Sequence, residues 1–251
     1  MEKEESYLRS VIDIRDKTNE ELFKNWLLCL GYDKCVEIFN NYQKLTNISG
    51  NAKMKDLIAF TQYCYDLSSI LFSLLRQEED YVKAFLSNTF NNYQVKIESR
   101  PSNYTKTKYY FKIPVGVNKY LDIRTFSYTD GPVDYYDAIK TLDFGDINLI
   151  MSHLPTGVIA KFSKNINIID DLRKTRELRN YVYHHNLLFS LGKSYLLDSI
   201  LMLIRNLPTK EIKKYYVSSI NTLRFQGSNR QEDIGENIAL YIDKEMLKDI
   251  F

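Results

Sequence analysis

The sequence contains little cysteine, histidine, tryptophan and glycine for its length. Its 251 residues include 3 Cys, 3 His, 1 Trp and 9 Gly. Cys29, Cys35 and Cys64 lack the paired short spacings of a zinc site, and they predict buried thiols in a reducing compartment. A metal centre in a chain with so few histidines would depend on carboxylates, and no run of the sequence supplies a recognisable set. We therefore expect no metal.

Long hydrophobic runs and a strong net charge are also absent. The longest apolar run, "SILMLI" at 199–204, is too short to cross a bilayer, and the acidic start "MEKEESYLRS" is not followed by an apolar signal core. These features predict a cytoplasmic protein with no membrane partner. The net charge is only +2, so a basic surface for nucleic acid would have to be local.

The common cofactor and hydrolase motifs are missing as well. The sequence contains no Walker-type loop, no dinucleotide glycine-rich turn, no H-E-x-x-H and no G-x-S-x-G. The "DFGD" segment at 143–146 matches the kinase D-F-G, but no glycine-rich loop or H-R-D precedes it, so we interpret it as a helix boundary. We expect no cofactor.

The sequence does contain enough hydrophobic residues, 44%, to form a buried core. Apolar residues recur at helical spacing over 18–45 and 52–94, and "NISGN" at 47–51 separates the two stretches. Helical patterns return from "DYYDAIKTLDF" (134–144) onward. Pro208 predicts the end of one helix, Thr209 the N-cap of the next, and Gly227 the break before a final helix at about 230–248.

The segment between these helical parts has a different composition. "YYFKI" (109–113) and "YLDIRTFSY" (120–128) are rich in aromatic and β-branched residues, and Pro114 and Gly116 lie between them. This pattern predicts a β-hairpin or short sheet. The fold class we expect is mainly α, a helical bundle with a small β-hairpin insertion around 105–130. We expect a single domain over 1–251, with 95–130 as its β-containing insertion.

The stretch "LRNYVYHHN" at 178–186 holds two of the three histidines. If 170–190 is one helix, residues three, four and seven apart share a face. One stripe is then mostly apolar and contains Leu178, Tyr181, Val182, His185 and Phe189. The other is polar and contains Arg173, Glu177, Asn180 and His184. The stripes therefore predict that His185 is a core residue with one hydrogen bond, whereas His184 is either a solvated side chain or a functional one.

Arginine and histidine together suit phosphodiester cleavage without metal. Arginine offers a permanent charge and a fork of donors that matches phosphate, and histidine exchanges protons near neutral pH. In RNA, the 2′-hydroxyl is an internal nucleophile that a histidine can deprotonate, or the histidine can protonate the leaving oxygen. One histidine cannot easily do both in one step, but two copies across a dimer interface could.

Three segments in order resemble a known family. Arg179-Asn180-x-x-x-His184 resembles the R-N-x-x-x-H form of the HEPN ribonuclease motif. "TLDFGDINLIMSHL" (141–154) is similar to the "SFG-x-LS-x-x-x-x-L" segment of the Abi-like abortive-infection family, which includes AbiD and AbiF. "YDLSSILFSLLRQEEDYVKAFLSNTF" (65–90) is similar to that family's "FD-x-x-LR" helix and the acidic turn after it.

The resemblance implies an HEPN-like helical bundle, a homodimer, and an RNase site that uses Arg179, Asn180 and His184 from both copies. It also implies a role in phage defence or in a toxin–antitoxin pair, with a protein or RNA antidote as partner. RNA would be the substrate, approached along Arg173, Lys174 and Arg176. Glu78, Glu79 or Asp80 would supply a supporting carboxylate, although a charged helix face is the commoner role of such residues. The alternative is a non-catalytic HEPN module that binds RNA or a partner protein.

Overall fold

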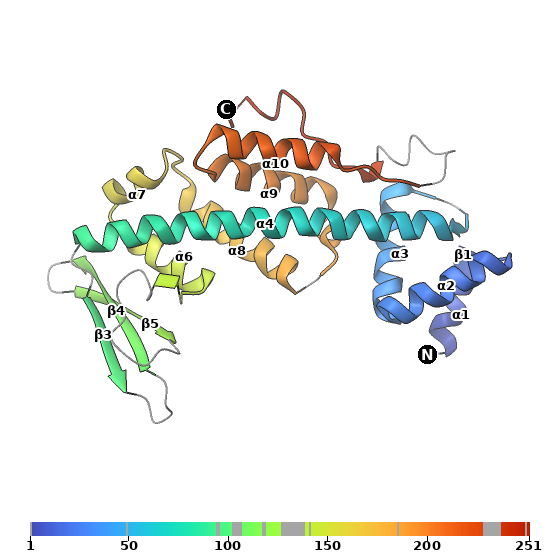
Figure 1. Cartoon of the computed structure of the whole chain (residues 1–251), viewed down its shortest axis with the longest axis horizontal. Helices are drawn as coiled ribbons and strands as arrows, with labels where there is room; N and C mark the ends of the chain where they lie inside the picture. The colour runs from blue at the N-terminus through green and yellow to red at the C-terminus, as the bar shows by residue number, and fades with distance from the viewer. Residues whose placement is uncertain are drawn as a thin grey trace. The chain divides into compact units, whose positions relative to one another are not determined.

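The computed structural model describes residues 2–48, 50–93, 96–101, 107–116, 119–126, 139–140, 142–184, 186–227, 237–248 and 250–251 (Figure 1). The chain divides into two compact units, each built from separate stretches of sequence. The first unit comprises Met1–Ser73, Tyr181–Leu201 and Glu211–Phe251. The second comprises Leu74–Asn180 and Met202–Lys210. The fold is mainly helical with a small β insertion, as the sequence predicts, and the single domain remains a prediction.

The first unit contains helices from both ends of the chain. Its elements are α1 (Glu2–Val11), β1 (Ile12–Asp13), α2 (Lys17–Leu30), α3 (Tyr32–Thr46), β2 (Ala52–Lys53), the first half of α4 (Met54–Tyr93), the 3-10 helix η1 (Leu188–Leu191), the start of α9 (Lys193–Asn206) and nearly all of α10 (Lys210–Thr222). β1 and β2 pair in parallel, with Ile12 opposite Ala52. Large apolar side chains fill its core, including Phe23, Phe39, Tyr42, Phe60 and Tyr63.

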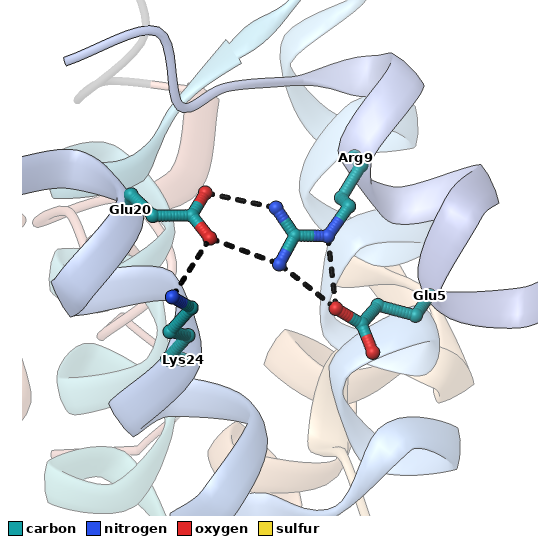
Figure 2. A network of polar contacts seen from close by, with 4 residues as sticks. All are labelled: Glu5, Arg9, Glu20 and Lys24. Carbon is teal, nitrogen blue, oxygen red and sulfur yellow. Dashed lines mark hydrogen bonds and ion pairs between the residues drawn. The ribbon is translucent and has the colours of Figure 1, made fainter. Parts of the chain in front are cut away.

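A network of charged side chains, the Arg9 network, joins α1 to α2 (Figure 2). Arg9 donates from Nη1 and Nη2 to the two carboxylate oxygens of Glu20, at 2.8 and 3.0 Å, and from Nε to Glu5 at 2.8 Å. Lys24 adds a second cation to Glu20 at 3.3 Å. The Arg9 guanidinium also lies 5.0 Å from the centre of the Phe23 ring. Each charge in the network therefore has a partner of opposite sign.

The C-terminal segment of the first unit is held by side chains that bond to its backbone. Asn221, on α10, accepts from the Ile242 amide at 2.8 Å and donates to the Ile242 carbonyl at 2.9 Å. The Tyr63 hydroxyl accepts from the Leu240 amide at 2.8 Å. The predicted final helix at about 230–248 is therefore wrong for 239–248, where the chain has no helix and residues 244–248 form turns. Bonds to side chains there replace the helical hydrogen-bond ladder.

The second unit contains the end of α4, a sheet, α6 (Phe144–His153), α7 (Thr156–Phe162) and most of α8 (Ile168–Tyr183). The sheet is antiparallel in the order β3 (Lys96–Pro101), β4 (Thr107–Gly116), β5 (Lys119–Phe126). This confirms the predicted β insertion and adds β3 to the expected hairpin. In the backbone register Phe111 pairs with Ile97 on one neighbouring strand and with Ile123 on the other, and the register shifts between Pro114 and Gly116.

Two helix boundaries bear on the sequence predictions. The predicted stretch at 18–45 is two helices, because Gly31 adopts a φ of 78° that ends α2 and precedes α3. Asp143 caps α6: it accepts from the Asp146 amide at 2.8 Å, and the Asp146 side chain accepts from the Asp143 amide in return. The interpretation of "DFGD" as a helix boundary is therefore confirmed. Residues 134–138 and 141 lie outside the described residues.

The cysteines divide into two kinds. Cys35 and Cys64 are buried thiols, and burial raises the pKa of Cys35 to about 12. Cys29 is exposed, so the prediction that all three thiols are buried is wrong. It lies one residue before the end of α2. Among the described residues, no helix combines the length and hydrophobicity that a membrane span needs.

Candidate functional site

Helix α8 carries the first part of the candidate motif and ends within it. Leu172, Leu178 and Val182 are buried, whereas Arg173, Glu177 and Asn180 are exposed. The predicted apolar and polar stripes of this helix are therefore confirmed up to Tyr183. Beyond Tyr183 the prediction of one helix over 170–190 is wrong, since His184 lies in a turn and η1 follows at Leu188.

The apolar residues after the motif explain why the helix ends there. Leu187, Leu188 and Phe189 are all buried, and three successive residues cannot share one stripe of an α-helix. Phe189 packs against Phe60 and Tyr63, with ring centres 5.6 and 6.1 Å away. Leaving the helix lets the chain bury all three. His185 lies outside the described residues, so its predicted role in the core remains a prediction.

Arg179 lies in the second unit and is held by an acidic side chain of α4. Its Nε donates to Glu79 Oε2 at 3.2 Å. Lys83 also pairs with Glu79, at 2.8 Å. The side chains of Arg179, Glu79 and Lys83 are only 22%, 13% and 16% exposed. Such shielding from solvent strengthens an ion pair relative to one at the surface. The Arg179 guanidinium therefore has a defined position. Asn180, the next residue, is exposed.

His184 lies in the first unit and is exposed. The chain passes from the second unit to the first between Asn180 and Tyr181, so the motif has its arginine and asparagine in one unit and its histidine in the other. The Tyr183 ring stacks on Phe72 at 4.6 Å, and this contact fixes the residue before His184. His184 therefore follows an anchored aromatic residue.

An open pocket of about 420 Å³ lies beside His184 in the first unit. Most of its lining is polar, from the start of α3 and from the segment after α8: Tyr32, Asp33, Lys34, Glu37, His184 and Asn186, together with Leu30 and Gly31. Lys34 and Glu37 form an ion pair at 2.8 Å, and Glu37 accepts from Ser190 at 3.0 Å. The pocket offers an aromatic ring, an ion pair and several hydrogen-bonding groups.

The three basic residues expected to approach RNA differ in their contacts. Arg173, Lys174 and Arg176 are all exposed. Arg173 pairs with Asp170 at 3.0 Å, both side chains being more than 60% exposed. The Arg176 guanidinium lies against Gly145, 3.2 Å from where a Cβ would stand. Burial raises the pKa of Asp146, and the charge of Arg176 opposes that rise. Arg176 is therefore partly engaged by the capping box of α6.

The acidic run at 78–80 separates into three environments. Asp80 is exposed, Glu79 binds Arg179, and Glu78 is completely buried. Sequence reasoning treated the three as equivalent. The helical period of α4 could have set Glu78 apart, because Glu78 follows the buried residues Leu74 and Leu75 by four and three positions.

Glu78 belongs to a set of polar residues in the second unit, the Glu78 cluster: Glu78, Asn165, Asp171, Thr175 and Asn206. Asn206 donates to Glu78 Oε1 at 3.4 Å, and Asn165 donates to Asn206 at 3.4 Å and to Asp171 at 2.7 Å. Burial and the charge of Asp171 raise the pKa of Glu78, Thr175 and Asn206 oppose the rise, and the resulting pKa is about 8. The Glu78 carboxyl is therefore mostly protonated at neutral pH.

The described residues contain no group of three or more His, Cys, Asp or Glu side chains placed to hold a metal ion. His153, the remaining histidine, is exposed on α6, with Nδ1 2.8 Å from the Leu149 carbonyl oxygen. No family model, curated protein or solved structure matches this chain. The Abi-like and HEPN assignments therefore remain predictions from the quoted motifs.

Proposed function

We propose that the protein is a metal-independent endoribonuclease of a bacterial abortive-infection or toxin–antitoxin system. The observation that carries the proposal is the pairing of a fixed arginine with an exposed histidine in one short motif. Glu79 holds Arg179 on the last turns of α8, and His184 lies directly after that helix beside a polar pocket. Cleavage would take place in the cytoplasm, as the sequence predicts.

In this mechanism the RNA supplies its own nucleophile. His184 takes the proton of the 2′-hydroxyl, or gives a proton to the leaving 5′-oxygen, and Arg179 stabilises the charge that builds on the phosphate. Asn180 orients His184 or the phosphate. The second histidine comes from a second copy of the chain in a homodimer. Arg173, Lys174 and Arg176 attract the RNA backbone, and the pocket beside His184 accepts the neighbouring nucleotide.

The proposal is tested by expressing the wild type beside His184→Ala, Arg179→Ala and, as a matched control, His153→Ala. Loss of a proton-transfer group slows cleavage by about 10²- to 10⁴-fold, so His184→Ala should restore growth and preserve cellular RNA. Because His184 is exposed, that variant should lose no more than about 0.5 kcal/mol of stability. His153→Ala should remain as toxic as the wild type. Equal toxicity of His184→Ala would refute the assignment.

The products and the assembly provide a second test with purified protein. Cleavage should survive EDTA, leave a 5′-hydroxyl and a cyclic phosphate, and spare DNA, which lacks the 2′-hydroxyl. Sedimentation should give twice the mass of the chain, because the composite site needs two copies. Activity that disappears with EDTA and returns with a divalent ion would refute this mechanism. A fully active monomer would refute the composite site.

One observation favours the second candidate, a non-catalytic module that binds RNA or a partner protein. The ion pair between Arg179 and Glu79 gives the arginine a structural role without any substrate. In that case Arg179→Ala and Glu79→Gln should lower the melting temperature alike, while His184→Ala changes neither growth nor RNA. Melting curves of all three variants, read beside the toxicity assay, separate the two candidates.

A further inference from the structure

The charges around the pocket beside His184 disfavour an ion as its ligand. The charged side chains of its lining are one lysine, Lys34, and two acids, Asp33 and Glu37. Even with a proton on His184, the cations do not outnumber the carboxylates, so the lining does not attract a phosphate group. Among the described residues, no group of acidic, histidine or cysteine side chains is placed to hold a metal there. The lining therefore suits an uncharged ligand that both donates and accepts hydrogen bonds.

Glu37 is engaged within the protein and holds Lys34 at the pocket. Its Oε2 accepts from Lys34 Nζ at 2.8 Å, and its Oε1 accepts from Ser190 Oγ at 3.0 Å. Asn41, which is buried, donates to Ser190 Oγ at 3.3 Å and completes this set of contacts. An ammonium group has three N–H donors, so a ligand oxygen can share the Lys34 ammonium with Glu37.

Asp33 is the acid of the pocket that a ligand can reach. It is exposed on α3, and none of the described residues donates to its carboxylate. A carboxylate has two acceptor oxygens, which can bind two neighbouring N–H groups at once. Tyr32, Asp33 and Lys34 are successive residues, so an aromatic ring, a pair of acceptors and a cation border the same pocket.

Guanine matches this set of groups better than the other bases of RNA do. It has two adjacent donors, N1–H and the N2 amino group, on the edge that pairs with another base, whereas adenine, cytosine and uracil have a single donor group there. Its O6 and N7 are acceptors that lysine recognises. Unpaired bases in RNA are bound by such hydrogen bonds together with stacking on an aromatic ring.

We infer that this pocket binds guanine: Asp33 accepts from N1–H and from the N2 amino group, Lys34 donates to O6 or N7, and the Tyr32 ring stacks on the base. Glu37 acts through Lys34 and is a positioning residue. The inference rests on the proposed function, because it takes RNA as the ligand. Since His184 borders the same pocket, the bound guanosine lies beside the bond that is cut and selects the cleavage site.

The direct test is binding of short oligouridines that contain one central guanosine, inosine or adenosine. They carry fluorine in place of each 2′-hydroxyl, so they lack the nucleophile and stay intact. A bidentate contact discriminates between bases by about 5- to 150-fold, so the Kd of the full-length wild type should be lower for guanosine than for adenosine by that factor. Inosine lacks the 2-amino group and should give an intermediate Kd. Fluorescence anisotropy measures all three.

Two variants show whether Asp33 is responsible for the preference. In Asp33→Asn the side-chain amide cannot accept from both donors of guanine, so the difference between guanosine and adenosine should disappear. Asp198→Asn, at an exposed residue of α9, is the matched control and should keep the difference. A preference for guanosine that survives in Asp33→Asn, or an equal loss of affinity for all three oligonucleotides, would overturn the inference.

Cleavage of an RNA pool of random sequence supplies the second readout. If His184 deprotonates the 2′-hydroxyl, guanosine should precede the cut, and if His184 protonates the leaving oxygen, guanosine should follow it. Sequencing of the product ends should show guanine enriched at one of these positions for the wild type and for Asp198→Asn, and at neither for Asp33→Asn. Products without guanine enrichment in the wild type would contradict the inference.

The binding measurement keeps this inference apart from the proposed function. A preference for guanosine that Asp33→Asn abolishes supports the inference even if no RNA is cut, and only the proposed ribonuclease activity then fails. Equal or undetectable binding of the three oligonucleotides overturns the inference, even if the wild type cleaves RNA efficiently.

Discussion

The Arg9 network of the first unit and the Glu78 cluster of the second differ in how they balance charge. In the Arg9 network, cations and carboxylates alternate near the surface, and every carboxylate faces a cation (Figure 2). In the Glu78 cluster, a buried carboxyl faces an amide, a hydroxyl and another acid. The first arrangement favours ionised groups, and the second favours a neutral acid. The two regions show that similar side chains are held in opposite protonation states by their partners.

The largest expected effect is the pH dependence of stability that Glu78 causes. Its pKa in the folded state, about 8, lies above its ordinary value of 4.5. Between these values the folded state keeps a proton that the unfolded state loses, so the free energy of unfolding falls as pH rises. We expect Glu78→Gln to gain on the order of 3 kcal/mol over the wild type between about pH 5 and about pH 8.

Denaturant unfolding of both proteins at the two pH values measures this gain. Subtracting the unfolding free energy of the wild type from that of the variant removes the contribution of the other titrating groups, because both proteins share them. If the difference does not change with pH, Glu78 is not a neutral acid in the folded protein, and the contrast with the Arg9 network disappears.

A smaller effect is expected from Thr175→Val, which replaces the hydroxyl by a methyl group of similar shape. If the hydroxyl is hydrogen-bonded to the Glu78 carboxyl, the variant loses about 1 kcal/mol because the carboxyl loses that partner. If the hydroxyl has no partner, its removal stabilises the protein. The sign of the change in unfolding free energy at neutral pH therefore decides between the two.

The smallest effect is expected from Glu20→Gln in the Arg9 network, and its pH dependence has the opposite sign. Arg9 lowers the pKa of Glu20, so the carboxylate contributes stability above its ordinary pKa and loses it as pH falls through the lowered value. The variant should therefore be slightly less stable than the wild type near neutral pH and equal to it in acid. Melting temperatures at low and high salt should show that the difference shrinks with salt. A difference that grows with salt would contradict a charge-based role.

Most of the fold can be predicted from the sequence because it follows from local patterns. The apolar spacing gives α4, the aromatic and β-branched runs give β4 and β5, and the cap of α6 is visible in Asp143 and Asp146. The end of α8 at Tyr183 cannot be predicted from a local pattern in this way. It depends on Phe189 reaching Phe60 and Tyr63, which are more than a hundred residues away in the chain.

In the candidate site, too, local patterns predict some features, whereas others depend on contacts between distant residues. The exposure of Asn180 could be predicted from the helical period, because it needs only the phase of α8. His184 is also exposed, but it lies in a turn after that helix. The partner of Arg179 could not be chosen from among Glu78, Glu79 and Asp80, because the choice depends on which face of α4 meets α8. The position of Glu78 in the helical repeat predicts a buried residue, whereas its carboxyl group is typical of an exposed one. The two predictions conflict, and its contacts in the structure show that it is buried.

The division of the chain into two discontinuous units has a consequence for synthesis on the ribosome. The second unit has all of its residues once Lys210 has emerged, whereas the first unit, which begins the chain, still waits for its last segment. Asn221 and Tyr63 cannot make their bonds to Ile242 and Leu240 until those two residues have emerged. The unit whose residues are made first is therefore completed after the second unit, and His184 belongs to an unfinished unit for longer than Arg179 does.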